Sequence, residues 1–515
     1  MKHKVTFLPD NVTIEMEHEG SLFKASKAAG VYVLSSCGGK GNCGKCKLVV
    51  KSGTVNPGSS RSYLTAEELD RGYVLACHSR VQSDLIVEIP QESRMQAKHK
   101  IATGANPDDI LKLMKQAGGC LESRIFRVYL DLAPPTIDDN IADFERVRRA
   151  LDNAGFSAGH LHMNYLVLSK LSRVLREGQW KVTVTVFSFS EVLEVLDIFP
   201  GNATKTRYGA AVDIGTTTVV VYLVDMKNGH IIGTASTYNS QVKCGDDVIT
   251  RIVYATEKNG LKELQELAVG NINTLLAELA EKSQIAPGLI DYIVVAGNTT
   301  MMHLFYGIDP QHIREEPYIP AATFFPPIRG KSVGLHLTPQ AVIYSMPNVA
   351  SYVGGDISSG VLVSQMHKQD KVSLFIDIGT NGEIVLGNKE WLVTAACSAG
   401  PAFEGSGIKF GMRAMEGAIE EVEIDPKTYE VNYRVIGDVK PIGICGSGMI
   451  DILAEMYLNN VIDQKGKIRE EIGSKRIRRG DSGLEYVIAW RIESAINKEI
   501  VITEVDLDNL IRAKA

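Results

Sequence analysis

Four cysteines near the N-terminus have spacings that could hold a metal centre. Cys37, Cys43 and Cys46 lie in the stretch SSCGGKGNCGKC, and Cys77 follows in GYVLACHSR. Cysteines with such spacings form disulfides, bind zinc or bind an iron–sulfur cluster. The chain has only eight cysteines in 515 residues, too few for a secreted disulfide scaffold. The disulfide interpretation is therefore the weakest of the three.

The asymmetry of this cysteine set separates the two remaining alternatives. Structural zinc sites usually use two short pairs of ligands. A binuclear iron–sulfur cluster takes three thiolates from one loop and a fourth from a distant position, as in the C-x4-C-x2-C pattern of plant-type ferredoxins. The spacing here is C-x5-C-x2-C, and the loop glycines can bring N–H groups close to sulfur. We predict a 2Fe-2S cluster bound by the four cysteines, with zinc as the alternative.

Two similar segments, 164 residues apart, could bind phosphate. AVDIGTTTVVVYLVD, residues 211–225, returns as FIDIGTNGEIVLGN, residues 375–388. Each predicts a strand that delivers an aspartate, Asp213 or Asp377, to a tight turn before a second strand. Backbone N–H groups of such turns bind anions, and carboxylates suit magnesium. One copy could simply cap its own turn, but two copies favour a Mg-ATP site.

Regular elements must position both sets of residues. Apolar alternation predicts two strands in KVTFLPDNVTIEME and a closing strand in LIVEIP, with a short helix in SLFKASKAAG. After Pro90 the sequence becomes polar, which predicts a linker. RIFRVYLDL and WKVTVTVF predict strands on either side of a helix in PPTIDDNIADFERVRRALDNAG. We expect domains at 1–92 and 124–205, a linker at 93–123, and a larger domain at 206–515.

Composition limits the class of protein and its partners. With 44% hydrophobic residues, 23% charged residues and a net charge of −6, the chain is typical of globular proteins and offers nothing for nucleic acid. No run approaches about 18 apolar residues, and the N-terminus lacks an apolar signal segment. We expect a cytoplasmic protein without a membrane partner.

The N-terminal region and the region with the DIGT hairpins each resemble a known family. Residues 1–91 resemble a β-grasp 2Fe-2S ferredoxin with the cysteine spacing of its adrenodoxin-like branch. The paired DIGT hairpins resemble the phosphate motifs of the actin, sugar kinase and heat-shock chaperone superfamily, which binds ATP between two lobes. A P-loop motif does not occur. The expected fold is therefore multidomain, α+β and α/β: a ferredoxin, a small α/β middle domain and a two-lobed actin-like ATPase domain.

The superfamily resemblance adds further expected site residues. The connecting segment YNSQVKCGDDVITRI offers residues that could place water or metal, and strand-to-helix turns in MPNVASYVGGDISSG and GICGSGMIDILAEM could approach the nucleotide, although each could be only a packing turn. The expected residues are Gly215, Thr216, Thr217 and Thr218 in the first hairpin; Gly379, Thr380 and Asn381 in the second; Gln241, Asp246 and Asp247 in the connecting segment; and Gly354, Gly355, Gly446, Ser447 and Gly448 in the turns.

The order of these motifs along nearly the whole chain resembles the ATP-dependent reductive activators of corrinoid proteins. This resemblance implies one-electron reduction of cobalt(II) to cobalt(I) in a corrinoid protein, either a corrinoid iron–sulfur protein or a methyltransferase subunit. It also implies an external low-potential electron donor and a homodimer. The chain stops at DLDNLIRAKA within a predicted helix, whereas similar proteins continue and complete the second lobe.

Three other functions would combine similar parts. An activator of another low-potential enzyme, such as a 2-hydroxyacyl-CoA dehydratase, would carry a 4Fe-4S cluster shared across a dimer and no ferredoxin domain. A small-molecule kinase with a redox-sensing ferredoxin would hydrolyse ATP in response to its substrate. A nucleotide-switched docking protein would keep its function after loss of the cluster.

Overall fold

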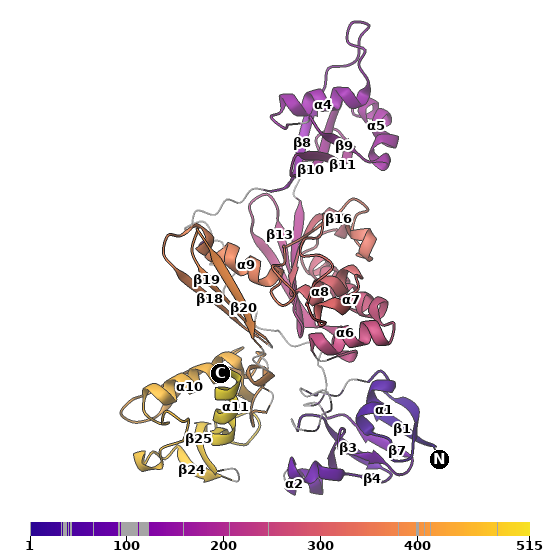
Figure 1. Ribbon diagram of the computed structural model, residues 1–515. Helices are drawn as coiled ribbons and strands as arrows, with labels where there is room; N and C mark the ends of the chain where they lie inside the picture. Colours follow the sequence, from indigo (N-terminus) through magenta and orange to yellow (C-terminus); the bar gives the residue numbers. More distant parts are fainter. Residues whose placement is uncertain are drawn as a thin grey trace.

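The structure, a computed structural model, describes residues 2–31, 33, 35, 39, 41, 44–64, 66–90, 93, 112, 123–157, 159–204, 207–245, 247–379, 381–397, 401–405, 407–412, 414–480 and 483–514. Within them the elements form an N-terminal sheet, a small α/β unit and two lobes that each contain one of the repeated hairpins (Figure 1). The predicted linker lies outside the described residues except at 93, 112 and 123.

The N-terminal sheet has the strand order β2-β1-β7-β3-β5 and packs against helix α1. β1 and β2 form an antiparallel hairpin, and β7 pairs with β1 in parallel. Alternate residues of β1 face the core, where Val5 and Phe7 are fully buried. The two strands, the helix and the closing strand predicted here are confirmed. The elements are β1 (Lys2–Leu8), β2 (Val12–Glu17), α1 (Leu22–Ala28), β3 (Lys47–Ser52), β4 (Val55–Asn56), α2 (Ala66–Asp70), β5 (Tyr73–Leu75), β6 (Arg80–Val81) and β7 (Leu85–Glu88).

The α/β unit is a four-stranded sheet in the order β8-β10-β11-β9, with α4 and α5 packed on one face. Both predicted strands are confirmed, but the helix begins at Asp143 rather than directly after the two prolines. Arg146 holds the intervening segment by hydrogen bonds to the Ala133 and Asp139 carbonyls. The elements are β8 (Ile125–Asp131), α4 (Asp143–Asn153), β9 (Leu161–Met163), α5 (Tyr165–Glu177), β10 (Lys181–Phe189) and β11 (Val192–Pro200).

The first lobe contains a six-stranded sheet in the order β14-β13-β12-β15-β17-β16. Strands β12, β15 and β17 run parallel, so their carboxyl ends share one edge. Helices α7 and α8 lie on one side of this sheet and α9 on the other (Figure 1). The elements are β12 (Tyr208–Ile214), β13 (Thr218–Asp225), β14 (Ile231–Tyr238), the 3-10 helix η3 (Ser240–Lys243), α6 (Val248–Glu257), α7 (Leu261–Lys282), β15 (Ile290–Gly297), α8 (Thr299–Tyr306), β16 (Ile328–Arg329), β17 (Val342–Ser345) and α9 (Gly355–Ser364).

The α/β unit docks on this first lobe through an apolar contact with ion pairs beside it. Phe187 and Leu196 belong to one buried cluster with Tyr292 and Val342 of the lobe. Beside them Asp291 accepts hydrogen bonds from Arg207, and Arg127 lies 3.4 Å from the same carboxylate. The unit and the first lobe therefore share a small buried cluster flanked by ion pairs.

The second lobe has three separate three-stranded sheets in the described residues, β18-β19-β20, β22-β21-β23 and β24-β25-β26. Helices α10 and α11 pack with the last two in one hydrophobic cluster. The elements are β18 (Ser373–Ile378), β19 (Gly382–Gly387), β20 (Leu392–Cys397), β21 (Ala418–Ile424), β22 (Val431–Val435), β23 (Gly443–Ile444), α10 (Gly446–Leu458), β24 (Ile477–Gly480), β25 (Gly483–Ala489), β26 (Ile500–Thr503) and α11 (Glu504–Lys514).

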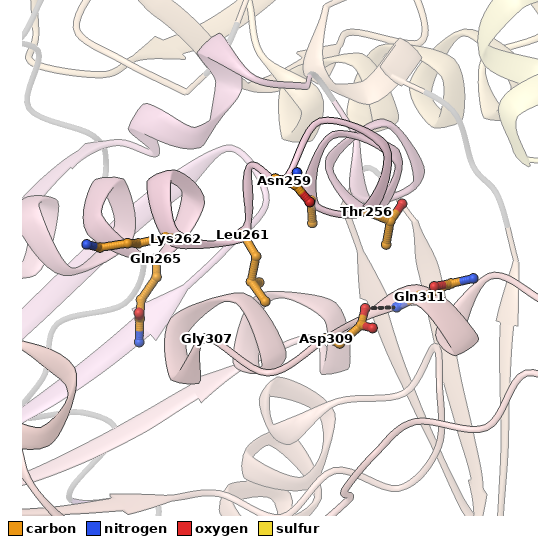
Figure 2. Close-up of a pocket in the computed structure, with 9 residues that line it drawn as sticks. Thr256, Asn259, Leu261, Lys262, Gln265, Gly307, Asp309 and Gln311 are labelled. Carbon is orange, nitrogen blue, oxygen red and sulfur yellow. Dashed lines mark hydrogen bonds between the residues drawn. The ribbon is translucent and has the colours of Figure 1, made fainter.

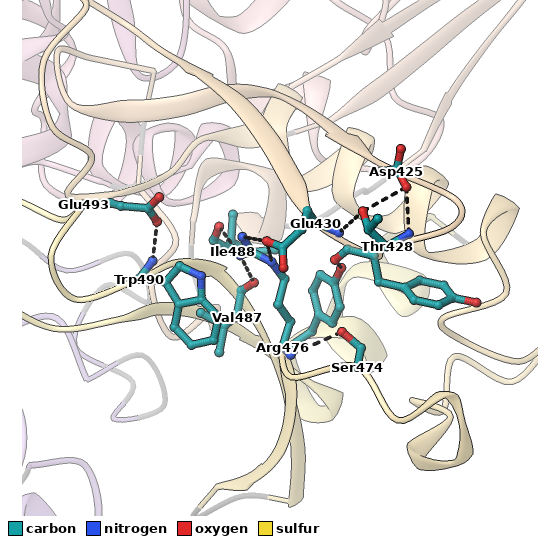
Figure 3. A network of polar contacts seen from close by, with 11 residues as sticks. Asp425, Thr428, Glu430, Ser474, Arg476, Val487, Ile488, Trp490 and Glu493 are labelled. Atoms are coloured by element: carbon teal, nitrogen blue, oxygen red, sulfur yellow. Dashed lines mark hydrogen bonds and ion pairs between the residues drawn. The ribbon is translucent and has the colours of Figure 1, made fainter.

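Arg476 fastens two of these sheets together (Figure 3). Its guanidinium is almost fully buried, donates to the Val487 and Ile488 carbonyls, and forms a two-pronged ion pair with Glu430. It also lies over the Trp490 ring at 5.2 Å. These contacts satisfy the buried charge, so the segment KGKIREEIGSKRIRR is partly built into the core.

Candidate cluster and nucleotide sites

Two of the four predicted cluster cysteines lie in described parts of the structure, and the fold brings them together. Cys46 directly precedes β3 and Cys77 lies in the turn after β5. Their sulfur atoms are 3.2 Å apart, too far for a disulfide and close enough for one metal ion to bind both. The other two, Cys37 and Cys43, lie outside the described residues. The described pair therefore fits half of a four-thiolate cluster site.

Two glycines between Cys37 and Cys43, Gly39 and Gly41, have backbone conformations and close neighbours that exclude a larger residue. Gly39 and Gly41 have φ values of 85° and 89°. A Cβ on Gly41 would lie 2.9 Å from the His78 ring, and one on Gly39 would lie 2.5 Å from the Phe23 ring. His78 also places Nε2 2.9 Å from the Gly41 carbonyl. His78 therefore connects Gly41 to the segment that carries Cys77.

Hydrogen bonds from two side chains to carbonyl groups of the first DIGT turn hold this turn in place. The Asn239 side chain donates to the Gly215 carbonyl at 2.8 Å, and the Arg251 guanidinium donates to the Thr216 carbonyl at 2.5 Å. In a trans peptide the N–H points away from the carbonyl of the same unit. The N–H groups of Thr216 and Thr217 are therefore directed away from Asn239 and Arg251, as a phosphate-binding turn requires.

Two neighbouring turns close against the first at the carboxyl edge of the sheet. Ile214 of β12 pairs with Gly297 of β15, and a Cβ on Gly297 would lie 2.7 Å from the Ile214 carbonyl oxygen. A Cβ on Gly354 would lie 2.4 Å from the Gly297 carbonyl oxygen. The structure thus places the predicted Gly354 and Gly355 beside the first hairpin. Ligands of open α/β sheets bind at this kind of edge.

The second hairpin places its aspartate as the first does, but its loop, 379–381, is one residue shorter than the loop 215–218 of the first. Asp377 is the penultimate residue of β18 and pairs with Glu383 of β19, as Asp213 of β12 pairs with Val220 of β13. Gly379 donates its N–H to the Asn381 carbonyl at 2.9 Å across the turn. Thr380 lies outside the described residues.

Four carboxyl groups interact around the two hairpins, and two of them were missed by the sequence analysis. The pKa of Asp213 is raised to about 7, first by desolvation from the surrounding protein and then by the charges of Asp356 and Asp377. Glu383 has its pKa raised to about 7 by the same causes in the same order. Burial is also the main cause that raises the pKa values of Asp356 and Asp377. Asp213 keeps contact with solvent, whereas Glu383 is only 9% exposed.

This concentration of negative charge suits a cation that arrives with its own ligands. In the described part of the chain, no three His, Cys, Asp or Glu side chains converge closely enough to chelate a metal. Magnesium in nucleotide sites typically uses one or two carboxylates together with phosphate oxygens and water. The arrangement therefore fits a metal that enters with a nucleotide better than a permanently bound ion.

The connecting segment has a different geometry from the one expected. Gln241 is fully buried: its amide nitrogen donates to the Leu264 carbonyl, and its oxygen accepts from Arg251. Asp247 is the N-cap of α6 and accepts from the Thr250 N–H. Asp246 lies outside the described residues. Both described side chains therefore have structural contacts, and a role in placing water or metal stays a prediction.

The GSG turn before α10 also has a structural explanation. A Cβ on Gly446 would lie 2.5 Å from the Phe403 carbonyl oxygen, and one on Gly448 would lie 2.4 Å from that of Ile419. Ser447 places its hydroxyl 3.4 Å from the Cys445 sulfur. Close backbone packing is enough to require both glycines, and the predicted adenosine contact stays untested.

One cavity of the first lobe has none of the hairpin residues in its lining (Figure 2). It measures about 440 Å³ and is lined by the end of α6, the start of α7 and the loop after α8, including Asn259, Lys262 and Asp309. None of the residues predicted to bind nucleotide lines it. This cavity is therefore separate from the predicted nucleotide site.

A β-grasp sheet with paired cysteines, joined to two lobes with matching phosphate hairpins, defines a ferredoxin fused to an ATPase of the actin superfamily. Comparisons with known proteins agree. Residues 5–82 match the 2Fe-2S iron–sulfur cluster binding domain, 115–205 the RACo linker region, 208–369 the RACo middle region, and 371–515 the C-terminal domain of RACo, the ASKHA domain. A solved structure described as a reductive activator for a corrinoid, iron–sulfur protein is 46% identical, with a TM-score of 0.70.

That structural match covers 99% of this chain and 81% of the solved chain, and it establishes that the protein belongs to the RACo family of reductive activators. The corrinoid activation enzyme RamQ of Eubacterium limosum is 29% identical over 98% of this chain and 80% of its own length. A reductase of a Co(II) methylated amine-specific corrinoid protein from Methanosarcina barkeri is 23% identical over 51% of this chain and 53% of its own. Among the described residues, no helix is long and apolar enough to cross a membrane.

Proposed function

We propose that this protein reduces cobalt(II) in a corrinoid protein to cobalt(I) in a reaction that requires ATP. The observation that carries the proposal is the presence in one chain of a paired-cysteine ferredoxin site and two matching phosphate hairpins, in a family whose relatives bear corrinoid-activating names. A 2Fe-2S cluster, when bound, stores and releases one electron. The proposed reaction consumes one electron for each cobalt(II) and gives one cobalt(I).

We propose that Cys37, Cys43, Cys46 and Cys77 hold the cluster. The described Cys46 and Cys77 are close enough to serve one iron, which leaves the two loop cysteines for the other. Anaerobically purified protein should therefore contain about two irons and two sulfides per chain, the composition of this cluster type. Zinc in place of iron, or a four-iron spectrum, would contradict the assignment.

We propose that Mg-ATP binds between the two hairpins, with magnesium beside Asp213 and Asp377. Burial raises the pKa values of both aspartates, and the charges of Asp356 and Asp377 add to the shift at Asp213. These raised pKa values support the placement, because a divalent cation favours the ionised form of a carboxylate. On this proposal the expected turn residues Thr216, Thr217, Thr380 and Asn381 contact phosphate. Asp356 and Glu383 join the site from α9 and β19.

An uphill electron transfer gives a physical reason for the ATP requirement. For one electron, each 59 mV of unfavourable potential reduces the equilibrium constant about tenfold. A gap of roughly 100 to 200 mV corresponds to about 2 to 5 kcal/mol. Nucleotide binding can supply this only if it favours the complex or the product state over the starting state.

Anaerobic absorption spectroscopy of cobalt(II) and cobalt(I) tests the proposal. The assay mixes a purified corrinoid carrier and a low-potential reductant with the full protein, with and without Mg-ATP. We expect ATP to raise the cobalt(I) yield and the Cys46→Ser variant to abolish it while ATP binding is retained. An equal yield without ATP would refute the coupling, and an active Cys46→Ser variant would remove the cluster from the electron path. Sedimentation of the same preparations tests the expected homodimer.

A further inference from the structure

The segment after β14 contacts the first phosphate turn at one end. Asn239 donates its side-chain N–H to the Gly215 carbonyl and its backbone N–H to the Thr217 carbonyl, both at 2.8 Å. Asn239 is also the N-cap of η3, where its side-chain oxygen accepts from the Gln241 N–H. Asn239 is fully buried. The turn and the start of η3 are therefore joined inside the lobe, without solvent between them.

Arg251 of α6 makes a second connection between the same two segments. Its guanidinium is fully buried and donates to the Thr216 carbonyl at 2.5 Å, to the Gln241 side-chain oxygen at 3.2 Å and to the Gly245 carbonyl at 2.9 Å. One rigid, planar group thus holds the phosphate turn and both ends of the segment 241–245. A displacement of the turn must be shared with this segment or break buried hydrogen bonds.

The outer side of η3 faces the ferredoxin. Val242 and Lys243 line one narrow cavity of about 40 Å³ together with Phe23 and Lys27 of α1. The remaining ferredoxin residues of this cavity lie at the end of α1 and in the stretch that leads to the cluster loop, namely Ser26, Gly30, Val31 and Val33. Lys27 and Lys243 both line this cavity, and charges of like sign do not attract each other.

The ferredoxin also contacts the second lobe, through a residue next to a predicted cluster ligand. Lys45, which precedes the predicted ligand Cys46, donates from Nζ to the Gly411 carbonyl at 2.9 Å. The ferredoxin therefore contacts both lobes through residues flanking its cluster loop. A nucleotide bound between the lobes would act on both contacts.

We propose that Arg251 and Gln241 transmit phosphate binding at the Gly215–Thr217 turn to the ferredoxin through Val242 and Lys243. This inference rests on the nucleotide site proposed above. Phosphate on the N–H side of the turn fixes the carbonyls on the opposite side, and Arg251 passes that order to η3. The fixed η3 then holds α1 of the ferredoxin more firmly. Arg251 is a positioning residue in this scheme, and it does not touch the nucleotide.

Hydrogen exchange of the full chain, with and without a non-hydrolysable ATP analogue and magnesium, tests this link. In the wild-type protein the analogue should slow exchange in 213–218, 240–245 and 21–31, the last by about fivefold, the lower end of typical coupling. Arg251→Lys keeps the charge but loses the planar fork. In this variant the analogue should still slow exchange in 213–218 and should no longer change it in 21–31.

A matched control comes from another buried arginine. Arg146 of the α/β unit is 1% exposed and hydrogen-bonded to two carbonyls, like Arg251. Arg146→Lys should leave the response of 21–31 intact. Loss of the response in both variants would show a general effect of a destabilised core and overturn the specific link.

The outcomes separate this inference from the nucleotide site itself. Unchanged exchange in 213–218 of the wild-type protein would refute the proposed site. A response in 213–218 without one in 21–31, or a full response in Arg251→Lys, would overturn the link alone. If Arg251→Lys fails to fold, Lys243→Glu tests the outer contact from an exposed position. Its new charge lies in the lining of the same cavity as Lys27, so exchange in 21–31 should slow even without nucleotide, and unchanged exchange would overturn the contact.

Discussion

The two DIGT hairpins share the position of the aspartate next to the turn but differ in their surroundings. In the first, alternate residues of β13 are fully buried, including Val221 and Leu223. In the second, Leu374 and Ile376 of β18 are 59% and 51% exposed, and Leu386 of β19 is 42% exposed. A hairpin therefore forms at the DIGT motif in both places, whereas the burial of its strands depends on the other elements of each lobe.

The described hydrogen bonds of the two turns also differ. The first is held by Asn239, Arg251 and Asn298, which lie far from it in sequence. For the described residues of the second, the contact within the turn runs from Gly379 to the Asn381 carbonyl. We infer that the contacts from Asn239, Arg251 and Asn298 pre-organise the first turn for phosphate.

The largest expected effect tests whether both hairpins serve one site. Asp213→Asn and Asp377→Asn should each reduce ATP hydrolysis at least about 100-fold, because each removes a charge that positions metal and phosphate. Phosphate release at saturating Mg-ATP measures this. Asp225→Asn, at the far end of the first hairpin, is the control and should hydrolyse ATP normally. Near-normal turnover in either active-site variant would show that its hairpin is only structural.

A smaller effect tests the pre-organisation of the first turn. Asn239→Ala removes the bond to the Gly215 carbonyl and leaves a buried acceptor unpaired, so ATP binding should weaken about tenfold. Asn273 of α7 also bonds a backbone carbonyl, that of Gly334, but away from the turn. Calorimetric titration should give Asn273→Ala the wild-type affinity. Equal affinities in both variants would show that the turn does not depend on its support.

The raised pKa values predict a pH dependence of the nucleotide-free protein. Asp213 and Glu383 have folded pKa values of about 7, above the unfolded values of about 3.9 and 4.3. Such groups bind protons more tightly in the folded state, so their stabilising contribution is complete below pH 4 and is lost as the pH rises through 7. Mg-ATP affinity should change in the opposite direction, because the metal needs the ionised carboxylates.

Thermal unfolding from pH 5 to 8 in the presence of a chelator measures this dependence. Other groups titrate as well, so the informative quantity is the difference between wild-type protein and Asp213→Asn. The variant should gain stability relative to wild type as the pH rises, and magnesium with ATP should reduce the gain. Parallel curves across the pH range would contradict the raised pKa of Asp213.

Sequence patterns predicted the elements and much of the candidate site, because those features depend on local spacing. The ferredoxin strands, the two hairpins and the glycine turns all follow from residues close in sequence. Asp356 and Glu383 had a local signal that was overlooked: each directly follows a glycine turn already assigned to the nucleotide.

Arg251 had no comparable signal. It is one charged residue on a helix, and its importance comes from burial and from carbonyls 6 and 35 positions away. The sequence also suggested that Gln241 could place water or metal, whereas the structure shows its amide bonded inside the lobe. Long-range contacts of this kind are set by tertiary packing, which motif spacing does not record.

The smallest expected effect tests the difference in burial between the two hairpins. Leu223 of β13 is fully buried and Leu386 of β19 is 42% exposed. Leu223→Ala should destabilise the first lobe by about 2–5 kcal/mol, since it removes transfer energy and leaves a cavity. Leu386→Ala should cost less than about 1 kcal/mol, because solvent already reaches the side chain. Urea unfolding followed by hydrogen exchange in each hairpin separates the two lobes, which need not unfold together. If Leu386→Ala costs as much as Leu223→Ala, the apolar face of β18 and β19 is covered in solution, and the two hairpins differ less than their exposed areas indicate.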